Sequence, residues 1–116
     1  TDVTGFGLIG HLLGICEASG VSAELNTSAV PLMEGAAQLA ARGIRSSLFP
    51  ENRMLAPWLK PSGAQDLLFD PQTAGGLLAA VAAEDAESLV EELRTGGDQA
   101  AIIGTLGKGA GGLRLV

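Results

Sequence analysis

The sequence has one cysteine, Cys16, no tyrosine, and aromatic residues at only 3% of its length. A single cysteine excludes an internal disulfide and a zinc site built from several cysteines, and we expect a reducing, cytoplasmic setting. With so few aromatic side chains, the core has to be built from Leu, Ile, Val and Ala. Because free cysteines are commonly buried and inert, we expect Cys16 to lie in that core.

Positive charge is also scarce, with 7 Lys and Arg against 13 Asp and Glu and a net charge of −6. The basic residues are scattered, whereas binding to a nucleic-acid backbone needs a basic patch. No apolar stretch approaches the ~20 residues of a membrane span, and the first residues do not read as a secretory leader. The expected partners therefore include neither nucleic acid nor a membrane.

The length of 116 residues suits one domain with a modest core. A hydrophobic content of 47% is that of a folded protein rather than a disordered one. The sequence begins without Met and directly within a motif. We therefore expect residues 1–116 to be one domain that is a fragment of a longer protein.

Apolar periodicity, interrupted by Gly and Pro, predicts the secondary structure. The expected helices span residues 5–18, 31–42, 51–59 and 84–94, with a short helix or turn at 64–69. The expected strands span residues 21–26, 75–82, 100–106 and 113–116. We expect the last two strands to form a hairpin through the glycine-rich residues 107–112. This order predicts an α+β fold with a mixed sheet covered by helices on one face.

Side-chain spacing also predicts the faces of two helices. In the first helix, one apolar face is expected from Phe6, Ile9, Leu13 and Cys16. A stripe of three glycines on the same helix indicates that another backbone passes close by: Gly7, Gly10 and Gly14. In the helix at 84–94, a second apolar face is expected from Ala86, Leu89, Val90 and Leu93.

The most informative stretch is Thr1–His11, TDVTGFGLIGH. Asp2 offers a hard oxygen ligand of the kind that Mg²⁺ takes from one or two carboxylates plus substrate phosphates. Thr4 and Gly5 stand where a hydroxyl and the free backbone N–H groups of a helix start attract anions. The alternative is structural, with Asp2 or Thr4 capping a helix that begins near Gly5. The single histidine, His11, lacks partners for a metal site, so we expect a buried or capping role.

A second motif, DPQTAGGLL, occupies Asp70–Leu78 and reads as a turn that enters a strand. In the structural interpretation, Asp70 caps the turn, Pro71 fixes φ, and Gly75 and Gly76 allow close packing. In the functional interpretation, the same turn lies at a domain interface and closes a nucleotide site. Turn chemistry favours the structural role.

The two motifs together resemble those of the selenide, water dikinase family, also called selenophosphate synthetases. The first is similar to the segment that opens the C-terminal half of that family. The second is similar to the family's DPQTSGGLL, with Ala74 in place of Ser. Between them, Asn52 follows a loop with Gly and Ser, as in the family. The resemblance implies an α+β C-terminal domain shared with aminoimidazole ribonucleotide synthetase.

That family makes selenophosphate from selenide, ATP and water, with release of AMP and phosphate. The resemblance implies that Asp2 helps to hold the Mg²⁺ ions that bridge ATP phosphates to the protein, with Thr4 and Gly5 on the phosphate side. It also implies an N-terminal ATP-binding domain as a partner within the same chain, a homodimer, and no activity of residues 1–116 alone. The family's cysteine or selenocysteine nucleophile belongs to the N-terminal part, so neither Cys16 nor any other residue here is assigned as catalytic.

Two alternatives stay open. The first is the C-terminal domain of a related ATP-dependent enzyme, such as aminoimidazole ribonucleotide synthetase or thiamine-monophosphate kinase. The second is a non-catalytic binding domain that kept the fold and binds neither nucleotide nor metal. The presence of Asp2 weighs against the second alternative.

Overall fold

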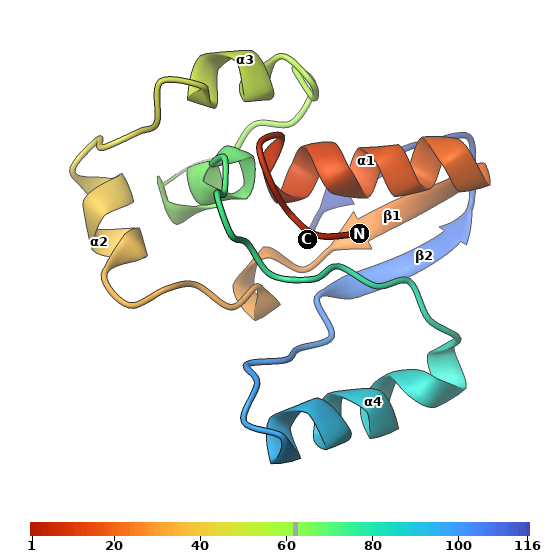
Figure 1. Cartoon of the computed structure of the whole chain (residues 1–116). Coiled ribbons are helices and arrows are strands. Elements are labelled where there is room, and N and C mark those ends of the chain that lie inside the picture. Colours follow the sequence, from red (N-terminus) through yellow and green to blue (C-terminus); the bar gives the residue numbers. More distant parts are fainter. Residues whose placement is uncertain (62) are drawn as a thin grey trace.

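The computed structural model describes residues 1–61 and 63–116 of the chain. Its helices are α1 (Gly7–Ser19), α2 (Ala36–Ala41), α3 (Phe49–Arg53) and α4 (Ala83–Thr95), and its 3₁₀ helices are η1 (Thr27–Ala29) and η2 (Gly63–Phe69). The strands are β1 (Val21–Leu25), β2 (Gly104–Lys108) and β3 (Leu113–Leu115). In Figure 1, α1 lies along the sheet and α4 lies at the far end of the molecule. None of the helices in the described ranges is long and apolar enough to cross a membrane.

The three strands form a mixed sheet in the order β2-β1-β3. β1 runs antiparallel to β2 and parallel to β3, which confirms the expected mixed α+β architecture. The predicted hairpin between the last two strands is wrong, because β1 lies between them. The glycine-rich residues 107–112 instead carry the chain across the end of β1. An added Cβ at Gly109 would lie only 1.7 Å from Ser22 Oγ, so the crossing requires a residue without a side chain.

The buried core joins α1, β1 and η2. Its largest fully buried side chains come from all three elements: Ile9, Cys16, Leu25 and Phe69. The spacing of apolar residues in α1 therefore predicted the buried face correctly at Ile9 and Cys16. It was wrong at Phe6, which precedes the helix and is 60% exposed. Each large apolar side chain buried in this core contributes about 1.5–3 kcal/mol to folding.

The glycine stripe on α1 has three different surroundings. Gly7 has a φ of +69° and lies against η2, where an added Cβ would be 2.8 Å from the carbonyl carbon of Phe69. A side chain at Gly10 would meet side chains rather than backbone, and no heavy atom lies within 4 Å of a Cβ at Gly14. The predicted close approach of another backbone is thus confirmed at Gly7 only.

Two of the predicted helices are shorter than expected. The helix predicted at 31–42 is reduced to α2, because Gly35 has a φ of +81°, a left-handed conformation that does not occur in the interior of a right-handed α-helix. The helix predicted at 51–59 is α3, which begins two residues earlier and ends at Arg53. Pro50 lies in its first turn, the part of a helix that accepts proline.

The predicted strand at 75–82 is wrong as a strand of the sheet. Only Leu77 in this stretch is paired, in an isolated antiparallel bridge with Asp2. The side chain of Leu77 is 88% exposed, although the apolar run predicted burial. The backbone partner of this stretch is the start of the chain, and the sheet β2-β1-β3 does not include it.

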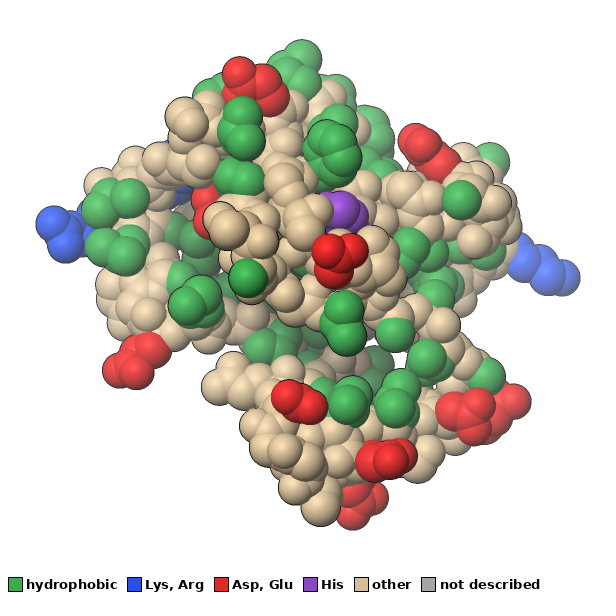
Figure 2. All heavy atoms as spheres, viewed as in Figure 1, with side chains coloured by type: hydrophobic (Ala, Val, Ile, Leu, Met, Phe, Trp, Pro, Cys, Tyr) green, Lys and Arg blue, Asp and Glu red, His purple; other side chains and the backbone are tan. Residues whose placement is uncertain are grey.

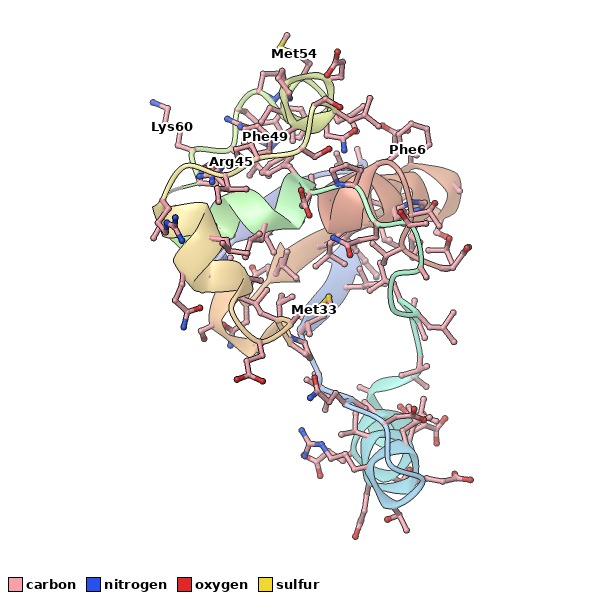
Figure 3. All side chains as sticks on the ribbon, turned by 60° about the vertical axis from the view of Figure 1, so that its left-hand side comes forward. Phe6, Met33, Arg45, Phe49, Met54 and Lys60 are labelled. Atoms are coloured by element: carbon pink, nitrogen blue, oxygen red, sulfur yellow. The ribbon has the colours of Figure 1, made fainter. Side chains whose placement is uncertain are left out.

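α4 spans the residues that its pattern predicted and one more at each end, but it does not bury its apolar face. None of its residues is buried, and Leu89 and Leu93 are 36% and 39% exposed. Figures 1 and 3 show α4 at one end of the molecule, joined to the rest by irregular chain on both sides. In Figure 2, hydrophobic and acidic side chains are exposed together on this part of the surface. The amphipathic spacing therefore predicted the helix but not its packing.

Candidate functional site

The two motifs singled out in the sequence lie against each other, although Thr1 and Leu78 are 77 positions apart. Thr1–Thr4, here called the docked segment, runs antiparallel to residues 72–78. Backbone hydrogen bonds hold it there: Val3 N–H to Gly76 O at 2.8 Å, Leu78 N–H to Thr1 O at 2.8 Å, and Gln72 N–H to Thr4 O at 3.0 Å. The structure therefore brings both motifs into one local surface.

The second motif is shaped to receive the docked segment. An added Cβ at Gly75 would lie 2.1 Å from the carbonyl oxygen of Val3, so only glycine allows this approach. The turn before it is closed locally, because Gln72 Nε2 donates to the Asp70 carboxylate at 3.2 Å. The close packing predicted for the two glycines is thus confirmed at Gly75, whereas a Cβ at Gly76 would have no heavy atom within 4 Å.

A buried asparagine links the flanks of the two motifs. Asn52, in α3, is 5% exposed. Its Nδ2 donates to the carbonyl oxygens of Gly5 and Phe69, each at 2.9 Å. Gly5 directly follows the docked segment, and Phe69 directly precedes Asp70. Sequence reasoning located Asn52 only through the family resemblance and gave it no role, because both of its partners are backbone atoms.

Thr4, the last residue of the docked segment, is tied to α1 by His11. The backbone N–H of Thr4 donates to His11 Nε2 at 2.9 Å, and Thr4 Oγ1 lies 3.1 Å from the same nitrogen. The aromatic ring of Phe6 contacts the imidazole, with 5.8 Å between ring centroids. His11 is partly buried, and its Nε2 accepts from a backbone group upstream of the helix.

The structure corrects the alternative in which Thr4 caps the first helix. α1 begins at Gly7 with Phe6 as its N-cap residue, and no side chain makes a capping hydrogen bond there. The side chain of Thr4 faces His11 instead, and its carbonyl oxygen accepts from Gly7 N–H at 3.1 Å. The left-handed φ of Gly7 explains why the helix starts two residues later than predicted.

Comparison with known proteins identifies the fold to which both motifs belong. A family model described as AIR synthase related protein, C-terminal domain, matches residues 1–115. The chain belongs to this family. The AIR synthase related C-terminal domain is an α+β fold, as the sequence predicted.

Curated relatives of this AIR synthase related domain include selenide, water dikinases. The chain is 41% identical to a selenide, water dikinase of Clostridioides difficile (strain 630) over 91% of its length, which is 32% of that protein. It is 40% identical to a selenide, water dikinase of Rhizobium meliloti (strain 1021) over 100% of its length, which is 35% of that protein. The resemblance drawn from the two motifs is thereby confirmed. The chain spans about a third of the length of these relatives.

Within this AIR synthase related domain, the three predicted site residues lie together at the start of the chain. Asp2 is exposed and lies opposite Leu77 in the bridge between the motifs. Gly5 is exposed, with no heavy atom within 4 Å of an added Cβ, and Thr4 is partly exposed. One exposed carboxylate, one partly exposed hydroxyl and one exposed glycine therefore lie within four consecutive residues beside the second motif.

Cys16 is fully buried in this domain, as predicted, on the core side of α1. Burial raises the pKa of its thiol, and the negative charge of Glu17 raises it further. Since the thiolate is the reactive form, we expect labelling by a thiol reagent at pH 8 to be slow. The rate should be at least about 100-fold below that of the same chain unfolded in urea, because labelling requires opening of a core helix. Equal rates in the two states would contradict this placement.

Proposed function

We propose that this domain is the C-terminal part of a selenide, water dikinase, in which Asp2 supplies one ligand to Mg²⁺ while Thr4 and Gly5 face the phosphates of ATP. The observation that carries the proposal is the docking of the two motifs, which fixes the backbone of the segment that contains Asp2 and Thr4 and directly precedes Gly5. The names of the relatives support it. The proposed reaction makes selenophosphate from selenide, ATP and water, with release of AMP and phosphate.

Asp2 fits the role of a single magnesium ligand. It offers an exposed carboxylate on a segment whose backbone is fixed by hydrogen bonds on both sides of it. Mg²⁺ is usually bound by one or two carboxylates plus substrate phosphates and water. Among residues 1–61 and 63–116, no group of three His, Cys, Asp or Glu side chains could hold a metal ion. The other ligands would therefore come from the nucleotide, from water and from the N-terminal domain of the longer protein.

In the proposed mechanism, residues of this chain position the metal ion and the phosphates of ATP, and the metal ion would neutralise charge. Phosphoryl transfer depends mainly on positioning and on stabilisation of charge on the phosphoryl oxygens, which bound Mg²⁺ supplies. Asp2 would fix the metal relative to the protein. The Thr4 hydroxyl and the open backbone at Gly5 would donate to phosphate oxygens. The proposal includes a cytoplasmic homodimer in which the N-terminal domain completes the site, so that residues 1–116 alone turn over no ATP.

The proposal is tested by Asp2→Asn in the longer protein, with AMP formation from ATP followed in the presence of Mg²⁺ and selenide. Asparagine keeps the size of the side chain but removes its charge. We expect AMP formation to fall by at least about 100-fold, the upper figure for loss of a partner of a metal ligand. Asp98→Asn, at an exposed aspartate outside both motifs, is the matched control and should stay within about twofold of the wild type.

The outcomes of this experiment separate the candidate functions. Equal activity of the Asp2→Asn protein and the wild type would remove Asp2 from the metal site while leaving the reaction in place. Production of ADP instead of AMP, without dependence on selenide, would favour a related synthetase or kinase. Absence of nucleotide binding in the folded longer protein would favour a non-catalytic domain. Turnover of ATP by residues 1–116 alone would contradict the proposed division of the site between two domains.

A further inference from the structure

His11 and Thr4 share a contact whose chemistry fixes the state of the imidazole. A backbone N–H can only donate, so the Nε2 atom that lies 2.9 Å from Thr4 N must present its lone pair. A ring that accepts at Nε2 is neutral and carries its proton on Nδ1. If Nε2 carried the proton, two N–H groups would point at each other at this distance. The backbone geometry therefore selects one tautomer of His11.

We propose that His11 is a positioning residue for the proposed formation of selenophosphate. Its effect on catalysis rests on that proposed function. As a neutral imidazole with the proton on Nδ1, it holds the docked segment in the orientation that presents Asp2. Thr4 is the last residue of that segment. Its N–H donates to His11, and its carbonyl oxygen accepts from the N–H groups of Gln72 and Gly7. With both groups fixed, the peptide planes on either side of Thr4 have one orientation.

The same contact determines what the Thr4 hydroxyl is free to do. Nε2 has one lone pair, and the Thr4 N–H takes it, because a backbone donor cannot turn away. Oγ1, at 3.1 Å from the same nitrogen, competes for that lone pair, but its hydrogen rotates freely. The hydroxyl therefore donates to an anionic oxygen of a ligand once one is present, which is the chemistry of a phosphate group. Pairing of His11 with the Thr4 N–H in this way leaves the Thr4 hydroxyl free to donate to a ligand.

The first test uses the 116-residue chain and two variants, His11→Gln, which keeps an acceptor near the position of Nε2, and His11→Leu, which removes it. ¹⁵N NMR of the wild type should show a protonated Nδ1 and an unprotonated Nε2. Exchange of the Thr4 amide hydrogen should be about fivefold faster with leucine, as expected for the loss of one hydrogen bond, and close to wild type with glutamine. The Cys16 labelling rate, which reports on the core, should be the same in all three proteins.

Two results would overturn the positioning role at this stage. One is a proton on Nε2 in the spectrum of the folded wild type. The other is equal protection of the Thr4 amide in the leucine variant and the wild type. Faster labelling of Cys16 in the leucine variant alone would indicate that His11 supports the helix as a whole rather than the docked segment, and would also count against the proposal.

The second test uses the longer protein and the Mg²⁺ concentration that gives half-maximal AMP formation. We expect His11→Leu to raise that concentration about fivefold, in line with the loss of one hydrogen bond. In the His11→Gln protein the concentration should be close to that of the wild type. Unchanged magnesium dependence with altered Thr4 exchange would show that His11 orders the segment without serving the reaction. If the wild type forms no AMP, the proposed function fails, whereas the amide exchange still decides whether His11 holds Thr4.

Discussion

Gly75→Ala is expected to separate the two motifs and to lower the free energy of unfolding by about 3 kcal/mol. The added Cβ would lie 2.1 Å from the carbonyl oxygen of Val3 and 3.1 Å from its carbonyl carbon. Overpacking of this kind typically costs about 1–3 kcal/mol. The hydrogen bond from Val3 N–H to Gly76 O depends on the same close approach, and its loss in the variant lowers the free energy of unfolding by about 1 kcal/mol more. Urea unfolding followed by circular dichroism measures the difference.

The neighbouring glycine provides the control for this substitution. No heavy atom lies within 4 Å of a Cβ placed at Gly76, and its φ is not in the left-handed region. We expect Gly76→Ala to change the free energy of unfolding by less than about 1 kcal/mol, in the range of substitutions that disturb no buried contact. If the two variants were equally stable, the close approach of Val3 to the second motif would not exist in solution.

Asn52→Asp is expected to be the other large change, again with a loss of about 3 kcal/mol at neutral pH. The substitution replaces the Nδ2 group, which donates to the carbonyl oxygens of Gly5 and Phe69, by an oxygen that repels both. Each lost hydrogen bond costs about 0.5–1.5 kcal/mol, and burial of an unpaired carboxylate adds to this loss. Urea unfolding at pH 7 gives the size of the effect.

The pH dependence of this variant has a predicted sign. Burial beside two carbonyl oxygens raises the pKa of the introduced carboxyl above its value in the unfolded chain, because the charged form is disfavoured. A group with a raised pKa stabilises the fold most below its unfolded pKa, and that contribution is lost as pH rises. The deficit relative to the wild type should therefore be smaller at pH 4, where the protonated acid can donate to one carbonyl, than at pH 7.

Asn26→Asp is the matched control for the asparagine prediction. Asn26 is exposed, and its Oδ1 accepts from both the N–H and the hydroxyl of Ser28. A carboxylate accepts equally well, so we expect a change below about 0.5 kcal/mol at any pH between 4 and 7. A large loss in this control would mean that the Asn52 result reflects added negative charge rather than the loss of two donated hydrogen bonds.

Local periodicity predicted those elements whose sequence pattern is self-contained. The apolar spacing in α1, the alternation in β1 and the amphipathic pattern of α4 each specify an element without reference to the rest of the chain. The connections between these elements were harder to predict. Glycine-rich residues between two strands are typical of a hairpin, but they equally allow the chain to cross the end of β1, and only the pairing of β1 with both strands decides between them.

The contacts that hold the predicted site residues in place could not be predicted from the sequence. Asp2, Thr4 and Gly5 were predicted as site residues because a carboxylate, a hydroxyl and a glycine at an expected helix start can be recognised in a sequence. The roles of Asn52 and His11 could not be recognised in the sequence, because both side chains bind backbone atoms. Asn52 binds residues remote in sequence, and His11 binds a residue on the other side of a turn. A backbone carbonyl or N–H has the same chemistry at every position, so its partner cannot be read from residue identity.

The central position of β1 has a consequence for how the chain folds as it is synthesised. β1 leaves the ribosome well before its partner strands, because the residues that bond to Ser22 include Gly112, 90 positions later. Synthesis proceeds at about 5–20 residues per second, so β1 waits several seconds with both of its edges unpaired. Pairing so distant in sequence makes folding slow and leaves strand edges open to association with other chains. Chain termination before Leu113 would leave one edge of β1 permanently open.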